Sequence, residues 1–222
     1  MDLLYTAHVP PGPGPFKTIL ALHGWGAGAH DLLGLAPILH RGDALVLCPQ
    51  GSTSFEIGPG TQGHGWFPLT RGRPPDLAAV ERAAAELDAF IDSAQARYPV
   101  EKDGVLLLGF SQGGVMAYRM FLAQPERFAG LVALSSWLPE ELAKSLPVLA
   151  EPTARPVLVM HGTADSMVEV ERARESRRRL LERRVPLTYR EYDMAHEIGR
   201  EALLELRSWI DDKVFAPIQL LG

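Results

Sequence analysis

Residues 106–114 read Leu106-Leu107-Leu108-Gly109-Phe110-Ser111-Gln112-Gly113-Gly114, an apolar run that leads into Gly-x-Ser-x-Gly. The apolar run predicts a buried β-strand, and the residues from Gln112 onward predict a helix. A serine on so sharp a strand-to-helix turn needs flanking glycines, because Cβ atoms there would collide with the neighbouring backbone. The alternative is a glycine-rich turn with an incidental serine, so the interpretation depends on what the rest of the chain supplies.

Short apolar runs and longer amphipathic runs alternate along the chain, which is typical of an α/β fold with crossover helices. Most apolar runs are continuous, as expected for parallel strands buried on both faces. We therefore predict a mostly parallel central sheet flanked by helices, with Leu3–His8 as an added edge strand. The predicted strands are Thr18–Leu22, Ala44–Cys48, Val105–Gly109, Leu131–Leu134, Val157–His161 and Thr188–Tyr192.

The clearest helix begins after Asp76, a predicted N-cap that follows two prolines. Its apolar residues recur at alternating steps of three and four and so share one face. These residues are Leu77, Val80, Ala84, Leu87, Ile91, Ala94 and Tyr98. Shorter helices are predicted over Asp31–Leu39, Gln112–Gln124 and Glu197–Asp211. We interpret the arginine-rich segment Val170–Arg184 as a solvated surface helix rather than an anion site, because glutamates are interspersed in it.

Two long segments, Gly51–Pro75 and Trp137–Pro156, interrupt the alternation of strands and helices. Long loops on a rigid sheet often form the walls of a binding site, so both are candidate binding segments. No repeat, low-complexity tract or linker divides the chain. A single domain over residues 1–222 is therefore predicted, with no large cap domain.

Composition and charge exclude several classes of protein. The chain is 46% hydrophobic and 22% charged, and its one cysteine, Cys48, excludes an internal disulfide. A net charge of −5 argues against nucleic-acid binding. Without a signal-peptide pattern or an apolar run of about 18 residues, we expect a soluble, cytoplasmic protein with no stable membrane insertion. The apolar stretch Val214–Leu221 is predicted to dock on the body, with a homodimer contact or contact with a lipid surface as the alternatives.

A serine hydroxyl is a weak nucleophile at neutral pH, so the serine hypothesis requires a base and an orienting acid. Asp165 follows the strand that ends at His161, and His196 follows the strand that ends at Tyr192. Both loops leave the same edge of the sheet as Ser111, and the chain order Ser, Asp, His fits this type of site. We predict Ser111 as the nucleophile, His196 as the base and Asp165 as the acid.

Other titratable side chains fit these roles less well. His161 is interpreted as a structural residue of its turn, and Asp193 lies too near His196 in sequence to approach it at the required angle. His64 could contact a substrate from the long loop. The remaining histidines lack any such context: His8, His30 and His40. No group of residues has the spacing of metal ligands, so no metal is predicted.

Acyl transfer also needs donors for the oxyanion of a tetrahedral intermediate. Gln112 offers a backbone N–H at a helix N-terminus. The second donor is expected from the loop after an early strand, here Leu22–Gly28, whose glycines let backbone amides turn inward. We predict the N–H of Trp25 as that donor.

Four motifs together resemble the carboxylesterase/phospholipase family of small α/β-hydrolases, which includes acyl-protein thioesterases and lysophospholipases. They are Leu22-His23-Gly24-x-Gly26, Gly109-Phe110-Ser111-Gln112-Gly113-Gly114, His161-Gly162-x-x-Asp165 and Tyr192-x-Met194-x-His196. Pro49-Gln50-Gly51, Gly65-Trp66-Phe67 and Pro125-Glu126-Arg127-Phe128 are also similar to the pattern of that family. The resemblance extends from about Lys17 to Ile210.

The resemblance implies an α/β-hydrolase fold and a Ser–His–Asp esterase without a cofactor. It places the triad on Ser111, Asp165 and His196, and the oxyanion donors on the amides of Trp25 and Gln112. Two positions depart from the family pattern. Ala195 stands where glycine usually precedes the catalytic histidine, and Ser136-Trp137 stands where a Ser-Gly pair is common.

We expect this chain to hydrolyse small carboxylic esters with short to medium acyl chains through an acyl-enzyme. Substrate contacts are expected from His23, Gly24, Trp66, Phe67 and Trp137. A lysophospholipase or an acyl-protein thioesterase would use the same chemistry on another acyl donor. A catalytically inactive hydrolase-fold protein that binds a ligand is the alternative from a different class.

Overall fold

A mostly parallel β-sheet forms the centre of the computed structural model, which describes residues 3–70, 72–148 and 153–215. Its strand order is β1-β3-β2-β6-β7-β8-β9, and only the pairing of β1 with β3 is antiparallel. The strands are β1 (Tyr5–His8), β2 (Phe16–Leu22), β3 (Leu45–Pro49), β6 (Val100–Phe110), β7 (Gly130–Leu134), β8 (Val157–Gly162) and β9 (Leu187–Tyr192). The predicted parallel sheet and its added edge strand are confirmed, and the structure shows that this edge strand runs antiparallel to β3.

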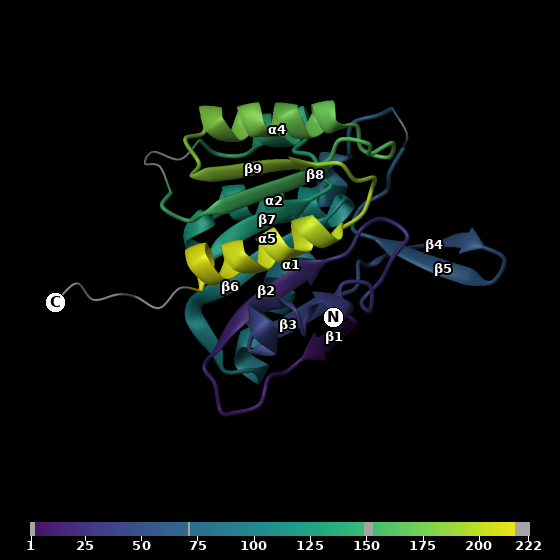
Figure 1. Cartoon of the computed structure of the whole chain (residues 1–222). Coiled ribbons are helices and arrows are strands. Elements are labelled where there is room, and N and C mark those ends of the chain that lie inside the picture. The colour runs from purple at the N-terminus through teal and green to yellow at the C-terminus, as the bar shows by residue number, and fades with distance from the viewer. Residues whose placement is uncertain (1–2, 71, 149–152, 216–222) are drawn as a thin grey trace.

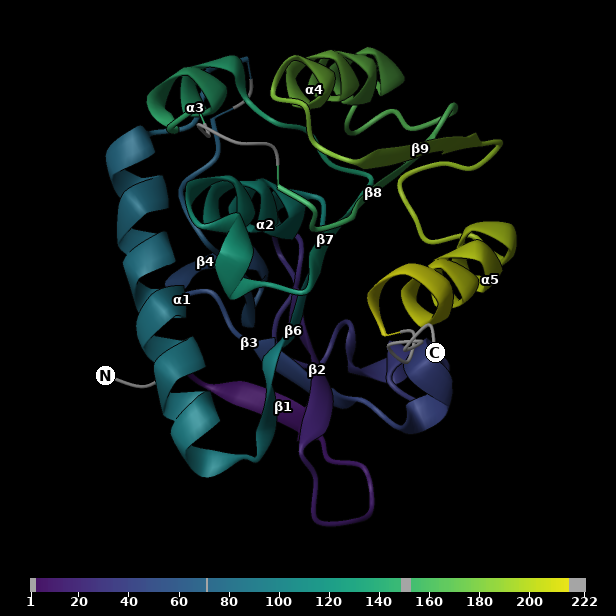
Figure 2. The same ribbon diagram turned by 90° about the vertical axis from the view of Figure 1, so that its left-hand side faces the viewer.

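Helices cover both faces of this sheet (Figures 1 and 2). One face carries α1 (Leu77–Arg97), α2 (Gln112–Ala123), α3 (Glu140–Ser145) and α4 (Val170–Glu182). The other carries α5 (Arg200–Trp209), the π-helical turn η4 (Ile210–Val214), and the short 3-10 turns η1 (Leu33–Leu35) and η2 (Leu39–Gly42). A further 3-10 turn, η3 (Pro125–Arg127), follows α2.

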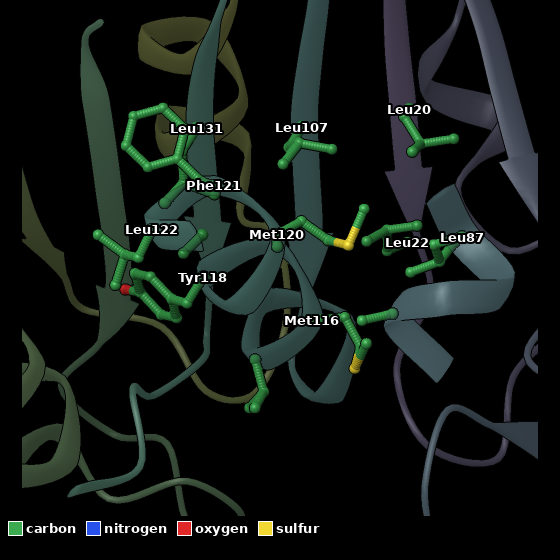
Figure 3. Close-up of a cluster of buried hydrophobic side chains, with 14 of the residues drawn as sticks. Leu20, Leu22, Leu87, Leu107, Met116, Tyr118, Met120, Phe121, Leu122 and Leu131 are labelled. Atoms are coloured by element: carbon green, nitrogen blue, oxygen red, sulfur yellow. The ribbon is translucent and has the colours of Figure 1, made fainter. Parts of the chain in front are cut away.

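Alternating residues of each central strand enter two separate hydrophobic cores. Leu20 and Leu22 of β2 belong to the core beneath α1 and α2, whereas Ile19 and Ala21 belong to the core beneath α5. In Figure 3, the side chains of α2 fill the first core between the strands and α1. This two-sided burial explains why the strand sequences are continuously apolar.

The strongest helix prediction is confirmed in its start and in its buried face. The carboxylate of Asp76 accepts a hydrogen bond from the N–H of Ala78 at 2.9 Å and caps α1. Most of the predicted apolar stripe is buried, and Leu77 and Tyr98 at its ends are half-buried against the core. The arginine-rich segment forms α4, whose arginines pair with the interspersed Glu171 and Glu175 and with Glu191 of β9.

Other predicted elements are corrected by the structure. The segment predicted as a helix over Asp31–Leu39 contains only the 3-10 turn η1 and the start of η2, because Gly34 and Pro37 interrupt any longer helix. The last helix begins at Arg200 rather than Glu197, after Gly199 in an extended conformation. The long segment Trp137–Pro156 includes the helix α3.

The glycine-rich segment Gly51–Pro75 contains an antiparallel hairpin that we did not predict. Strands β4 (Thr53–Gly58) and β5 (Thr61–Gly65) form it, and Figure 1 shows it projecting from the sheet. Its alternation of Thr53, Phe55 and Ile57 with polar residues was the available signal.

The start of the apolar C-terminal stretch packs on the body of the protein, as predicted. Phe215 is buried, and the rings of His40 and Phe215 lie 5.0 Å apart between centroids. The rest of the predicted stretch, residues 216–221, lies outside the described residues. Within the part of the chain that the structure covers, no helix combines the length and hydrophobicity needed to cross a bilayer.

The start of α2 lies directly against the sheet because Gly113 has no side chain. A Cβ atom at Gly113 would overlap the backbone carbonyl of Leu22 in β2, and one at Gly109 would overlap the carbonyl of Gly113. Strand β2, strand β6 and helix α2 therefore meet at van der Waals distance through backbone atoms alone.

We predict that Gly113→Ala destabilises the protein by about 3 kcal/mol or more, since the backbone of β2 cannot move away from the added methyl group. Gly34→Ala is the matched control: no atom lies within 4 Å of its added Cβ, and a change within about 0.5 kcal/mol is expected. Urea unfolding of both variants measures the difference. Equal stability of the two would contradict the packing described here.

Candidate active site

Ser111 occupies a strained turn between β6 and α2. Its backbone has φ 53° and ψ −118°, a conformation that residues with a side chain rarely adopt. Both of its backbone polar groups are held by the end of β7. The N–H of Ser111 donates to the carbonyl of Leu134 at 2.9 Å, and its carbonyl accepts from the Ser136 hydroxyl at 2.7 Å. The turn therefore presents Ser111, half-buried, at the carboxyl edge of the sheet.

Asp165 and His196 come from the loops that follow the next two strands along the sheet, β8 and β9. The Nδ1 atom of His196 lies 2.7 Å from Oδ2 of Asp165 and forms a hydrogen bond with it. The two loops are joined through their backbones, because the N–H of Thr163 donates to the carbonyl of Tyr192 at 2.8 Å. Gly162 permits this approach, since a Cβ there would overlap the carbonyl of Met194.

The carboxylate of Asp165 is fixed on both of its oxygens. Oδ1 accepts hydrogen bonds from the N–H groups of Met167 at 2.9 Å and Val168 at 2.8 Å, which leaves Oδ2 for His196. The Asp165 side chain is fully buried, whereas that of His196 is 20% exposed. A buried carboxylate satisfied in this way orients the imidazole and favours its protonated form during a reaction.

The His196 ring reaches the serine turn. Its centroid lies 4.9 Å from the ring centroid of Phe110, the residue immediately before Ser111. An added Cβ on Gly24 would lie 3.3 Å from the Cβ of Ser111 and 3.3 Å from Cδ1 of Phe110. The structure therefore brings the predicted nucleophile, the predicted base and the predicted oxyanion loop to one place.

The loop that carries Trp25 is supported by the β4–β5 hairpin. The N–H of Gly26 donates to the carbonyl of His64 at 2.8 Å, and the N–H of His64 donates to the carbonyl of Ala27 at 3.0 Å. The Trp25 ring stacks on Phe55 of β4 with centroids 3.9 Å apart. The unpredicted hairpin therefore fixes the backbone around the predicted oxyanion donor.

Gln112 uses its side chain to hold the segment after the hairpin. Its Oε1 accepts from the N–H of Trp66 at 2.9 Å, and its Nε2 donates to the carbonyl of Phe67 at 2.6 Å. The side chain is fully buried, which leaves only the backbone N–H of this residue for a role at the helix start. Gly65 lies beneath the Trp25 ring, where a Cβ would overlap that ring.

Comparison with known proteins leads to the family that the sequence motifs resemble. The sequence profile of the family described as Phospholipase/Carboxylesterase matches residues 8–213. The chain belongs to this family. A probable carboxylesterase of Oryza sativa subsp. japonica is 29% identical over 157 residues, which are 68% of this chain and 59% of the rice protein. Carboxylesterase SOBER1 of Arabidopsis thaliana is 31% identical over 153 residues, 65% of this chain and 66% of that protein. The matched regions thus span less than two thirds of either relative.

Solved structures give the same result for the fold. Esterase PE8 is 25% identical and superposes with a TM-score of 0.81, covering 96% of this chain and 100% of that one. SOBER1 of Arabidopsis thaliana is 27% identical with a TM-score of 0.72, covering 89% of this chain and 98% of its own. The α/β-hydrolase fold expected from the motifs is confirmed, and the four main motifs lie at the carboxyl ends of β2, β6, β8 and β9.

Several residues predicted to contact substrate are placed elsewhere. Trp66 and Phe67 are buried in the core beneath α1 and α2, and a side chain without exposed surface cannot line a groove. Trp137 is also buried, with the Arg172 guanidinium 4.3 Å from its ring centroid. For Trp66 and Phe67 the prediction is corrected, because these side chains complete the core and support the site from behind. Contact of Trp137 with substrate stays a prediction, since 7% of this residue is exposed.

His23 is a buried structural residue of the predicted oxyanion loop rather than a surface contact. Its Nδ1 donates to the carbonyl of Gly24 at 2.8 Å, and its Nε2 accepts from the N–H of Gly51 at 3.0 Å. The carbonyl of His23 also accepts the indole N–H of Trp66 at 2.9 Å. Gly24, another of the predicted contacts, lies against Ser111.

Two buried groups near the site were not assigned a role from the sequence. Ser135 and Ser136 follow β7, and the Ser135 hydroxyl donates to the carbonyl of Glu197 at 3.3 Å, next to His196. The clue to Ser135 and Ser136 in the sequence was that both follow the carboxyl end of a predicted central strand. Across residues 3–70, 72–148 and 153–215, no three His, Cys, Asp or Glu side chains gather as metal ligands.

Burial keeps two histidines beside the site in their neutral form. It lowers the pKa of His23, whose two nitrogens are both used as described above. It also lowers the pKa of His161, whose Nε2 donates to the carbonyl of Val168 at 2.7 Å while its buried Nδ1 has no partner. Protonation of His161 would bury a second N–H without an acceptor. His161 is therefore the structural residue that the sequence suggested, next to Asp165 but not charged beside it.

These shifts predict that the free energy of unfolding falls as the pH falls below 6.5, the ordinary pKa of histidine. In that range the unfolded chain binds protons that the folded protein does not, at a cost of up to about 1.4 kcal/mol per pH unit for each ring. Urea unfolding at about pH 7.5 and about pH 5.5 measures the slope.

The variant His161→Gln keeps an N–H donor for Val168 but cannot be protonated, so it should lose part of this slope. His30→Gln, at an exposed imidazole, is the control for loss of one ring. An unchanged slope in His161→Gln would show that the buried ring titrates alike in the folded and unfolded states, against the burial argument.

Proposed function

We propose that this protein is a serine carboxylesterase that hydrolyses small esters with short to medium acyl chains through an acyl-enzyme. The observation that carries the proposal is the 2.7 Å hydrogen bond between His196 and buried Asp165, next to a serine held at φ 53°. A histidine aligned by a buried carboxylate beside a strained serine is the arrangement that activates a hydroxyl.

Acylation begins when Oγ of Ser111 attacks the carbonyl carbon of the ester and His196 accepts its proton. Asp165 holds the Nδ1–H of His196, so Nε2 is left free to act as the base, and the carboxylate stabilises the imidazolium that forms. The tetrahedral intermediate then collapses, and the alcohol leaves with the proton from His196. Deacylation repeats these steps with water as the nucleophile, which releases the acid and restores the Ser111 hydroxyl.

The oxyanion of the intermediate requires two backbone donors, for which we propose the N–H groups of Gln112 and Trp25. Gln112 begins α2, where the helix dipole favours negative charge. Trp25 follows Gly24, whose backbone lies against Ser111. The stacking of Trp25 on Phe55 and the two backbone hydrogen bonds to His64 support a fixed direction for this amide.

The acyl preference is proposed from the packing around the site. Trp66, Phe67 and Trp137 fill the core and do not form an open channel, which favours short to medium acyl groups over long ones. The names of the relatives, carboxylesterase and probable carboxylesterase, support the ester as the substrate class. Lysophospholipids and acyl thioesters remain alternatives with the same chemistry.

Ser111→Ala is expected to reduce ester hydrolysis by at least about 10⁴-fold while leaving the protein folded, because alanine removes only the nucleophile. Hydrolysis of p-nitrophenyl butyrate measures the activity, and a thermal melt checks the fold. A fluorophosphonate probe should label the wild type and not the variant. Absence of labelling in the wild type would favour a catalytically inactive binding protein.

Asp165→Asn is expected to lower kcat by about 10⁴-fold, since an amide cannot hold the Nδ1–H tautomer of His196. Asp193→Asn is the matched control, because Asp193 is exposed and three residues before His196. Loss of activity in the control rather than in Asp165→Asn would reassign the acid.

The substrate class is tested with p-nitrophenyl esters of rising chain length beside a lysophospholipid and an acyl thioester. We expect the largest kcat/KM for acyl groups of about two to six carbons, since each added methylene contributes only where apolar surface receives it. A maximum on long chains, or on either of the other acyl donors, would replace this part of the proposal.

A further inference from the structure

Ser136 is a buried serine with no assigned role, and its hydroxyl is directed at the backbone of Ser111 itself. The hydroxyl donates to the carbonyl oxygen of Ser111 at 2.7 Å. The same carbonyl also accepts from the N–H of Gly114 at 3.0 Å. Gly114 makes room for the contact, because a Cβ there would overlap the Ser136 hydroxyl.

The carbonyl of Ser111 belongs to the same peptide unit as the N–H of Gln112. A peptide unit is planar and trans, so its C=O and N–H point in opposite directions and turn together. Two donors that fix the Ser111 carbonyl therefore also fix the direction of the Gln112 N–H. A hydrogen bond to the carbonyl further polarises that N–H as a donor.

We propose that Ser136 is a positioning residue that aims the Gln112 N–H at the oxyanion by holding the other end of its peptide unit. This inference rests on the proposed esterase function and adds a residue to it. Ser136 itself touches neither the substrate nor the reacting atoms. Its contribution appears when negative charge develops on the substrate oxygen, because a misdirected donor loses most of its strength there.

The second proposed donor is held in the same way. Its N–H, on Trp25, shares a peptide unit with the carbonyl of Gly24, which accepts from Nδ1 of His23 at 2.8 Å and from the N–H of Ala27 at 3.3 Å. In both units, one buried side chain and the backbone N–H three residues later hold the carbonyl. The repetition of this arrangement at two unrelated loops supports a role in aiming the two amides.

The position of Ser136 along the sheet explains why this residue can hold the carbonyl of Ser111. It follows β7, the neighbour of β6 in the sheet, and Leu134 at the end of β7 accepts the N–H of Ser111. The backbone groups on both sides of the nucleophile are thus tied to one rigid strand end. Ser135 between them is strained, with φ 45°, as is often found near functional sites.

The test is Ser136→Ala, which removes one hydroxyl and leaves the Ser111 carbonyl bonded to Gly114, so the fold should persist. We expect kcat for p-nitrophenyl butyrate to fall about tenfold with KM nearly unchanged. Affinity for a trifluoromethyl ketone, which forms an oxyanion on Ser111, should fall by a similar factor. The midpoint of the acidic limb of kcat/KM against pH should stay in place, because His196 and Asp165 are untouched.

Ser176→Ala is the matched control, since Ser176 is another buried serine whose hydroxyl donates to the carbonyl of Arg172 at 2.7 Å and accepts from Leu138. Rates are expressed per site labelled by a fluorophosphonate, so that misfolded molecules do not count. We expect Ser176→Ala to change stability but not the rate per labelled site. If the wild type neither hydrolyses esters nor is labelled, the proposed function fails. If the wild type is active and Ser136→Ala matches it per labelled site, or loses activity without losing ketone affinity, the positioning role is overturned.

Discussion

The backbone of Ser111, held at φ 53° between β6 and α2, is the constraint around which the site is built. Such a conformation costs free energy, on the order of 1–3 kcal/mol, and persists only where neighbours determine it. Here the neighbours are glycines at 109 and 113, which let two strands and a helix meet without side chains, and the end of β7, which bonds the Ser111 backbone on both sides. The rigid sheet thus holds the turn in its strained conformation.

The proposed acid, Asp165, and the proposed base, His196, are likewise placed by backbone contacts. The loops after β8 and β9 are bonded to each other before either side chain is considered, and Gly162 lets them approach. One carboxylate oxygen of Asp165 then accepts hydrogen bonds from its own loop, and the other accepts one from His196. The position of His196 relative to Ser111 therefore depends on the register of the parallel strands β6, β7, β8 and β9.

The sequence was sufficient for the parallel sheet and the long helices because their signals are periodic and summed over many residues. It was also sufficient to gather Ser111, Asp165 and His196, since the ends of parallel strands meet at one edge. It failed for the hairpin, where Gly58, Pro59 and Gly60 read as loop and the strands are largely exposed. It failed as well for Trp66 and Phe67, because an aromatic residue near a site packs in either direction and only the tertiary structure decides which. The position of Ser136 after a central strand was visible in the sequence, but its hydrogen bond to the Ser111 carbonyl was not, because that bond depends on the tertiary structure.

The β4–β5 hairpin has a consequence for protein engineering. His64 of the hairpin forms a backbone hydrogen bond with Gly26 in the loop around Trp25. Phe55 of the hairpin stacks on the Trp25 ring, and Gly65 lies against the same ring. Residues 22–28 and 53–65 therefore behave as one module, although 24 residues of chain separate them. A chimaera that imports the hairpin of a relative without the partner loop would inherit mismatched surfaces, so the two segments have to be transplanted together.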